Sequence, residues 1–150
     1  MDCMTMDSPC GMLTVWTDGN ALVRLAFTGT EPNEPETPLL RKARAQLEEY
    51  FSGKRRVFDL PLAPAGTPFQ QDVWRALRTI PYGQTWSYAR LAEQAGHAGA
   101  YRAAGTANGK NPLPIFIPCH RVIHGDGTLG GYTSGLEIKR TLLKLENDYA

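Results

Sequence analysis

The chain has 150 residues, a formal net charge of +1, and 42% hydrophobic and 21% charged residues. These values fit one globular domain or two small ones. Three cysteines are too few, and an odd number, for a secreted scaffold held by disulfides. No apolar run reaches the roughly 18 residues of a membrane span, and residues 1–10 lack the regions of a signal peptide. We therefore expect a cytoplasmic protein, nuclear if the source is a eukaryote, with no membrane contact.

The first part of the chain is predicted to form two strands, a helix and a short strand. Leu13 and Val15 lie in an alternating segment, and residues 17–20 carry a hairpin turn signal. A second alternating segment places Val23, Leu25 and Phe27 on one face. Apolar residues recur at helical spacing from residue 40 to residue 51, and Gly53 ends this helix. No chemical motif occurs here, so we expect a supporting α/β lobe.

A proline-rich seam at residues 60–68 separates this lobe from the rest of the chain. Residues 1–65 hold seven basic and nine acidic residues, a net charge of −2. Residues 66–150 hold nine basic and six acidic residues, a net charge of +3. This difference favours phosphate contact by the second part. We expect domains at residues 1–63 and 64–150.

The second part is predicted to be mostly helical. Thr67 and Pro68 suit the N-cap and first position of a helix, and Ser87 suits the N-cap of another that runs to about residue 96. Small residues form a helix over 100–108, and the last helix covers about 136–146. Two short helices joined by a glycine-containing turn are typical of a helix-turn-helix.

The segment 111–123 combines three prolines, a buried apolar run at 115–117, and Cys119 followed by His120. A cysteine reacts as thiolate, so its pKa of about 8.5 must be lowered or a base supplied. His120 and Arg121 are the local candidates for this role. A buried cysteine is also often a small core residue. The histidines and cysteines lack zinc-ligand spacing, so no metal site is expected.

The sequence Pro118-Cys119-His120-Arg121-Val122 resembles the active-site signature of the O6-alkylguanine-DNA alkyltransferases. Further segments occur in the order of that family: residues 67–74, 80–83, 87–88, 103–105, Asn108, 111–112, 130–132 and 142–146. The resemblance covers about residues 67–146, whereas residues 1–63 fit the family's variable lobe only loosely. It implies an α+β protein, with a small RNase H-like α/β lobe and a helical, winged-helix-like domain that carries the helix-turn-helix.

The resemblance implies a monomer that binds double-stranded DNA carrying alkylated bases and needs no cofactor. The alkylated base, O6-alkylguanine with O4-alkylthymine as a second candidate, is flipped out, and its alkyl group passes irreversibly to Cys119 in one turnover. His120 is the implied general base, acting through a water, and Glu146 orients it. Asn111 ties the surrounding segments together, and Tyr88 donates a proton to the guanine.

The implied DNA contacts lie on the second helix of the helix-turn-helix. Arg102 fills the gap left by the flipped base, and the helix enters the minor groove with the residues Tyr101, Ala103, Ala104, Gly105 and Asn108. The base pocket is implied to contain Tyr88, Val122, Tyr132, Thr133 and Ser134, and the carbonyls of Cys119 and Val122 accept from the guanine amine. Two positions depart from the family. Ser134 replaces a frequent glycine, which predicts a tighter or stiffer pocket wall and a narrower range of alkyl groups, and Tyr101 replaces a usual alanine, which predicts different groove contacts.

Three other functions compete with alkyl transfer. A binding-only relative lacks the nucleophile, and Cys119 argues against it. A helix-turn-helix regulator needs long polar side chains on its second helix, which Ala103, Ala104 and Gly105 do not supply. A cysteine-histidine hydrolase turns over repeatedly, whereas the expected modification is single and permanent.

Overall fold

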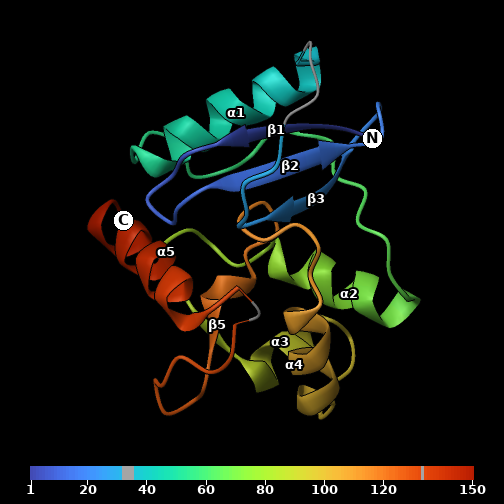
Figure 1. Cartoon of the computed structure of the whole chain (residues 1–150). Helices are drawn as coiled ribbons and strands as arrows, with labels where there is room; N and C mark the ends of the chain where they lie inside the picture. Colours follow the sequence, from blue (N-terminus) through green and yellow to red (C-terminus); the bar gives the residue numbers. More distant parts are fainter. Residues whose placement is uncertain (32–35, 133) are drawn as a thin grey trace.

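The computed structural model describes residues 1–31, 36–132 and 134–150. Its first part is a three-stranded antiparallel sheet in the order β1-β2-β3, with α1 (Pro38–Phe51) packed on one face (Figure 1). The strands are β1 (Asp2–Met6), β2 (Leu13–Thr17) and β3 (Leu22–Ala26). Strand β1 was not predicted, because residues 1–10 are acidic and polar overall, although Cys3, Met4 and Met6 are buried.

The hairpin between β2 and β3 follows its predicted turn. Gly19 has φ +102°, and the Asp18 carboxylate accepts from the amides of Asn20 and Ala21. The register shifts between Trp16 and Thr17, so that Leu22 and Leu25 are the buried residues of β3. The predicted alternation is therefore wrong for Val23, which lies at the bulge and is only half-buried. Phe27 follows the strand and packs against the core, as predicted.

The free edge of β3 is bound to the proline-rich seam and to the second part of the chain. Leu22 exchanges backbone hydrogen bonds with residues 61 and 63, at 2.9 and 2.8 Å, and forms an isolated bridge with Leu62 in place of the predicted short strand. Farther along, the Leu25 amide donates to the Pro112 carbonyl at 2.9 Å. The sheet thereby holds the segment that leads to Cys119.

The second part contains α2 (Pro68–Leu77), α3 (Tyr88–Gln94) and α4 (Tyr101–Gly109), which pack against one another. Thr67 and Ser87 cap α2 and α3 as predicted, because each side chain accepts from a first-turn amide. The Trp74 indole donates to the Ala107 carbonyl at 2.8 Å and fixes α2 against α4. The helix-turn-helix and the α+β class are confirmed.

Three further elements complete the second part. A 3₁₀ turn, η1 (Cys119–Arg121), leads into β5 (Val122–Ile123), which pairs in parallel with β4 (Trp86–Ser87), a pairing the sequence did not predict. The last helix is α5 (Leu136–Asp148) and lies beside η1. Among the described residues, no helix is long and apolar enough to cross a membrane.

Candidate active site

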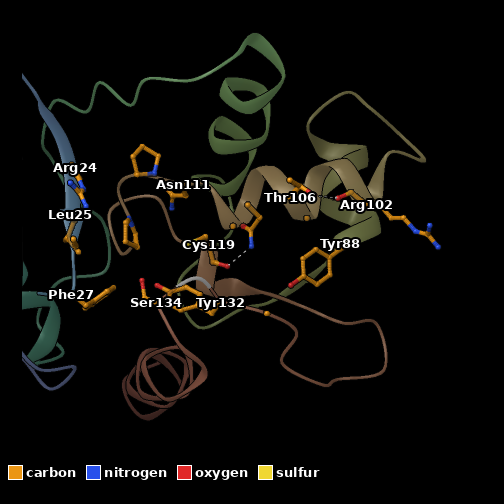
Figure 2. Close-up of a pocket in the computed structure, with 17 residues that line it drawn as sticks. Arg24, Leu25, Phe27, Tyr88, Arg102, Thr106, Asn111, Cys119, Tyr132 and Ser134 are labelled. Atoms are coloured by element: carbon orange, nitrogen blue, oxygen red, sulfur yellow. Dashed lines mark hydrogen bonds between the residues drawn. The ribbon is translucent and has the colours of Figure 1, made fainter.

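Cys119 stands at the start of η1 and is nearly buried, with 5% of its surface exposed. The Asn111 side chain shapes the preceding segment: its amide donates to the Ile117 carbonyl at 2.7 Å, and its oxygen accepts from the Leu113 amide at 2.9 Å. Asn108 of α4 donates to the Cys119 carbonyl at 3.4 Å (Figure 2). Two asparagines thus fix the backbone on both sides of the thiol.

His120 and Glu146 form a buried pair, with His120 Nε2 2.7 Å from Glu146 Oε2. An ionised carboxylate only accepts hydrogen bonds, so Nε2 carries the proton. His120 Nδ1 is then the unprotonated nitrogen, and it has no hydrogen-bond partner among the described residues. The structure therefore brings Cys119, His120 and Glu146 together and leaves the histidine with a free basic nitrogen.

The Glu146 carboxylate is surrounded by donors. Arg121 donates to it through Nε at 2.7 Å and Nη2 at 2.9 Å, and through Nη1 to the Ile80 carbonyl at 2.8 Å. Arg121 was predicted as a candidate to lower the pKa of the Cys119 thiol, but its guanidinium binds the Glu146 carboxylate instead. The Tyr50 hydroxyl of α1 also donates to Glu146, at 2.6 Å. No local signal pointed to Tyr50, because 96 residues separate it from Glu146.

Burial dominates the protonation of these groups. It raises the pKa of Cys119, and the nearby Asn111, Tyr132 and Lys139 offset this only in part. Burial also lowers the pKa of His120, against the opposing influence of Glu146. For Glu146, burial alone would raise the pKa, but His120 and Arg121 outweigh it and lower the pKa. The resting site therefore holds a neutral thiol, a neutral imidazole and a carboxylate.

Lys139 of α5 is a buried residue of the site that the sequence analysis missed. Its ammonium donates to the carbonyls of Val122 at 2.7 Å and Gly131 at 3.3 Å, and also to that of Leu129. Burial lowers the pKa of Lys139 to about 8, so it is mostly charged at neutral pH. The loop from 122 to 131 is thus held against α5. The Val122 carbonyl, implied as a guanine contact, already accepts one hydrogen bond.

The Tyr88 side chain packs against Gly105, Gly130 and His124. A Cβ at Gly130, whose φ is +71°, would lie 2.6 Å from the Tyr88 hydroxyl, and a Cβ at Gly105 would lie 3.3 Å from the ring. The His124 ring contacts Tyr88 with centroids 5.3 Å apart. Burial, followed by the proximity of Cys119, raises the pKa of Tyr88, so its hydroxyl stays protonated. Because Gly105 and Gly130 have no side chains, they leave room for the protonated Tyr88 phenol near the Cys119 thiol.

A cavity of about 730 Å³ opens beside Cys119. Figure 2 shows Tyr88 and Arg102 on one side of Cys119, and Arg24, Leu25 and Phe27 of the sheet region on the other. Tyr132 and Ser134 line the same cavity, whereas Thr133 lies outside the described residues. This is the size of a typical small-molecule site, so the cavity can take a nucleobase with its substituent.

The predicted DNA-contacting residues divide between the two faces of α4. Tyr101, Arg102 and Ala103 are exposed, Gly105 is half-buried, and the Arg102 side chain points away from Cys119 (Figure 2). Ala104 and Asn108 are buried on the inner face. The outer face of α4 is therefore free for a partner, while the inner face supports the cysteine.

Comparison with known proteins assigns the chain to a family. The family model for the 6-O-methylguanine DNA methyltransferase DNA-binding domain matches residues 68–148, and that for the ribonuclease-like domain of the same family matches residues 1–64. These matches and the two relatives below show that the chain belongs to the 6-O-methylguanine DNA methyltransferase family. The resemblance found in the sequence is thereby confirmed.

Curated relatives and a solved structure agree with this assignment. The methylated-DNA–protein-cysteine methyltransferase of Mycobacterium leprae is 47% identical over 96% of this chain and 91% of its own length. The constitutive enzyme of the same name from Bacillus subtilis is 45% identical over 95% and 93%. The Mycobacterium tuberculosis OGT crystallised in complex with DNA is 46% identical, with a TM-score of 0.90 over 100% of this chain and 95% of that one.

Proposed function

We propose that this protein repairs alkylated double-stranded DNA by direct reversal, moving the alkyl group from O6 of a flipped guanine to Cys119 in a single turnover. The observation that carries the proposal is the buried arrangement of Cys119, His120 and Glu146 beside a cavity of nucleobase size. The family membership and the DNA complex of a similar protein support it.

The cysteine needs a base, because burial raises the pKa of its thiol. His120 Nδ1, the nitrogen without a described partner, takes the thiol proton through a water. Glu146 stabilises the imidazolium that forms. The thiolate sulfur then bonds to the alkyl carbon while the bond from that carbon to O6 breaks, and the electron pair goes to the guanine. Tyr88 donates a proton to the guanine ring.

The thioether product explains the single turnover. Its carbon–sulfur bond offers no good leaving group, so the thiol is not regenerated. Asn111 and Asn108 act on the backbone around Cys119, through the carbonyls of Ile117 and Cys119. These two contacts hold the backbone around Cys119 in place for the transfer.

Duplex DNA binds to the outer face of α4, in the minor groove. Ala103 and Gly105 allow close approach, Tyr101 adds an exposed ring to the same face, and Arg102 enters the base stack in place of the flipped nucleotide. Ala104 and Asn108 support the helix from its inner face. The flipped base lies in the cavity against Tyr88, Tyr132 and Ser134, and Val122, which follows the Cys119 turn, is a further proposed contact.

We further propose that residues 1–63 form a supporting lobe and residues 64–150 the DNA-binding and transfer domain. All three cysteines are free thiols, which suits a reducing compartment such as the cytoplasm. The proposed unit is a monomer, and sedimentation equilibrium that found a stable dimer would contradict this.

Intact-mass measurement after mixing with a duplex that holds one O6-methylguanine tests the proposal. We expect one added methyl group, mapped to Cys119, a restored guanine and a one-to-one end point. Cys119→Ala is expected to bind the duplex without gaining mass. An unmodified protein that prefers the lesion duplex would indicate a binding-only role, and one without preference would indicate a regulator.

A further inference from the structure

Tyr50 connects the supporting lobe to the proposed proton relay. Its hydroxyl donates to Glu146 Oε2 at 2.6 Å, and His120 Nε2 lies 2.7 Å from this same oxygen. Arg121 Nη2 donates to Oε2 as well, at 2.9 Å, whereas Oε1 accepts from Arg121 Nε at 2.7 Å. Tyr50 and His120 therefore both form hydrogen bonds to the same negatively charged oxygen, Glu146 Oε2.

The Tyr50 hydroxyl is a permanent donor. Its side chain is fully buried among the rings of Phe51, Phe58 and Tyr82. Burial, followed by the charge of Glu146, raises the pKa of Tyr50 well above its ordinary value. A phenol that does not ionise in the working pH range only donates to the carboxylate.

Each donor on a carboxylate oxygen reduces the charge that the other donors encounter. A hydrogen bond to an ionised group is among the stronger ones in proteins, so the loss of one redistributes a substantial interaction. We propose that Tyr50 sets the basicity of His120: by sharing Oε2, its hydroxyl limits how strongly Glu146 stabilises the imidazolium. Tyr50 is thus a positioning residue that acts through Glu146, and this role rests on the proposed relay.

Other charged and titratable groups also face this pair. They come from η1, α5, α1 and the segment after α2, and they are Arg121, Lys139, Tyr50 and Tyr82. Cys119 precedes His120 in η1. Tyr82 offers a matched control, because its ring contacts Tyr50 with centroids 6.3 Å apart. Its hydroxyl is buried without a hydrogen-bond partner among the described residues.

The test compares Tyr50→Phe with Tyr82→Phe in single-turnover transfer from a duplex that holds one O6-methylguanine. Loss of the Tyr50 hydroxyl strengthens the bond from His120 to Glu146 and makes His120 more basic. The rising limb of the pH–rate profile is expected to move to higher pH by about half a unit to one unit. On that limb the rate then falls about three- to tenfold, while the plateau is kept. Tyr82→Phe is expected to leave the limb unchanged.

A second measurement does not depend on transfer. The NMR signal of the His120 Nε2 proton is expected to move downfield in Tyr50→Phe, because its hydrogen bond strengthens, and to stay in place in Tyr82→Phe. Should Tyr50→Phe fail to fold, 3-fluorotyrosine at position 50 keeps the ring and the hydroxyl. Its more acidic phenol donates more strongly, so both the limb and the proton signal are expected to move in the opposite direction.

Unchanged His120 signals in both Tyr50 variants would overturn the inference and leave Tyr50 a packing residue. Failure of the relay itself is distinguishable from this result. A His120→Ala protein with undiminished transfer would refute the proposed mechanism, even where the NMR signal of the wild-type histidine responds to Tyr50.

Discussion

The backbone amide of Leu25 donates to the carbonyl of Pro112, so an edge strand of the first lobe is hydrogen-bonded to the segment that positions Cys119. Tyr50 makes a second connection, from α1 to Glu146. The lobe that carries no motif in its sequence therefore holds both the approach to the nucleophile and the carboxylate behind its base. Variants in either lobe are expected to affect transfer.

Arg102→Ala is expected to weaken repair in duplex DNA more than transfer from free O6-methylguanine. The exposed Arg102 is proposed to stack in the place of the flipped base, and such stacking contributes about 1–3 kcal/mol. This corresponds to a loss of about five- to 150-fold in the duplex assay. Arg140→Ala, which removes an exposed arginine from α5, serves as the control. Equal losses in both assays would contradict the stacking role.

Glu146→Gln is expected to abolish most transfer and to lower the free energy of unfolding by about 3 kcal/mol, because the buried Arg121 loses its counter-charge. Glu137→Gln, at an exposed position of the same helix, is expected to change stability by less than about 0.5 kcal/mol. Urea unfolding at pH 7 measures both. A Glu146→Gln protein as stable as the wild type would refute the buried ion pair.

The same pair predicts an acid-sensitive stability. The pKa of Glu146 is lower in the folded than in the unfolded chain, where it is about 4.3. Its contribution is therefore complete above the unfolded value and is lost as the pH falls. The difference in unfolding free energy between wild type and Glu146→Gln is expected to shrink below about pH 4. A difference independent of pH would contradict this linkage.

Gly130→Ala is expected to impair transfer through Tyr88. The new Cβ would lie 2.6 Å from the Tyr88 hydroxyl, and φ at this position is +71°, a conformation that costs a non-glycine residue about 1 kcal/mol. Gly131→Ala has open space at the next position and is the matched control. Single-turnover transfer rates of the two variants test this prediction. Equal rates would mean that transfer does not depend on the space that Gly130 leaves for the Tyr88 hydroxyl.

Lys139→Met is expected to loosen the loop that follows Cys119. The ammonium, charged at pH 7 because its pKa is about 8, donates to three carbonyls between residues 122 and 131. Amide hydrogen exchange in this loop is expected to accelerate and transfer to slow. Lys144→Met, on an exposed part of the same helix, controls for the loss of a lysine. If amide hydrogen exchange in the loop 122–131 is unchanged in Lys139→Met, contacts other than those of Lys139 hold the loop in place.

Local signals in the sequence predicted the local features of the structure. Thr67 and Ser87 cap their helices as expected because a cap depends on residues within one turn. The Cys119-His120 motif likewise occupies a single 3₁₀ turn. Tyr50 and Lys139 were missed because their partners are distant in the chain, and an isolated tyrosine or lysine on an amphipathic helix has no distinguishing pattern. The register shift of β3 was missed because a bulge breaks strict alternation.

Lys139 and Glu146 lie seven residues apart on α5, and both are buried. Seven residues make about two helical turns, so both side chains project from the same face of α5. Lys139 points toward the loop 122–131 and Glu146 toward His120. A single inserted residue between them would rotate Glu146 by about 100°. Homologous proteins that use this arrangement are therefore expected to tolerate length changes in the exposed turn near residues 125–128 but none between positions 139 and 146.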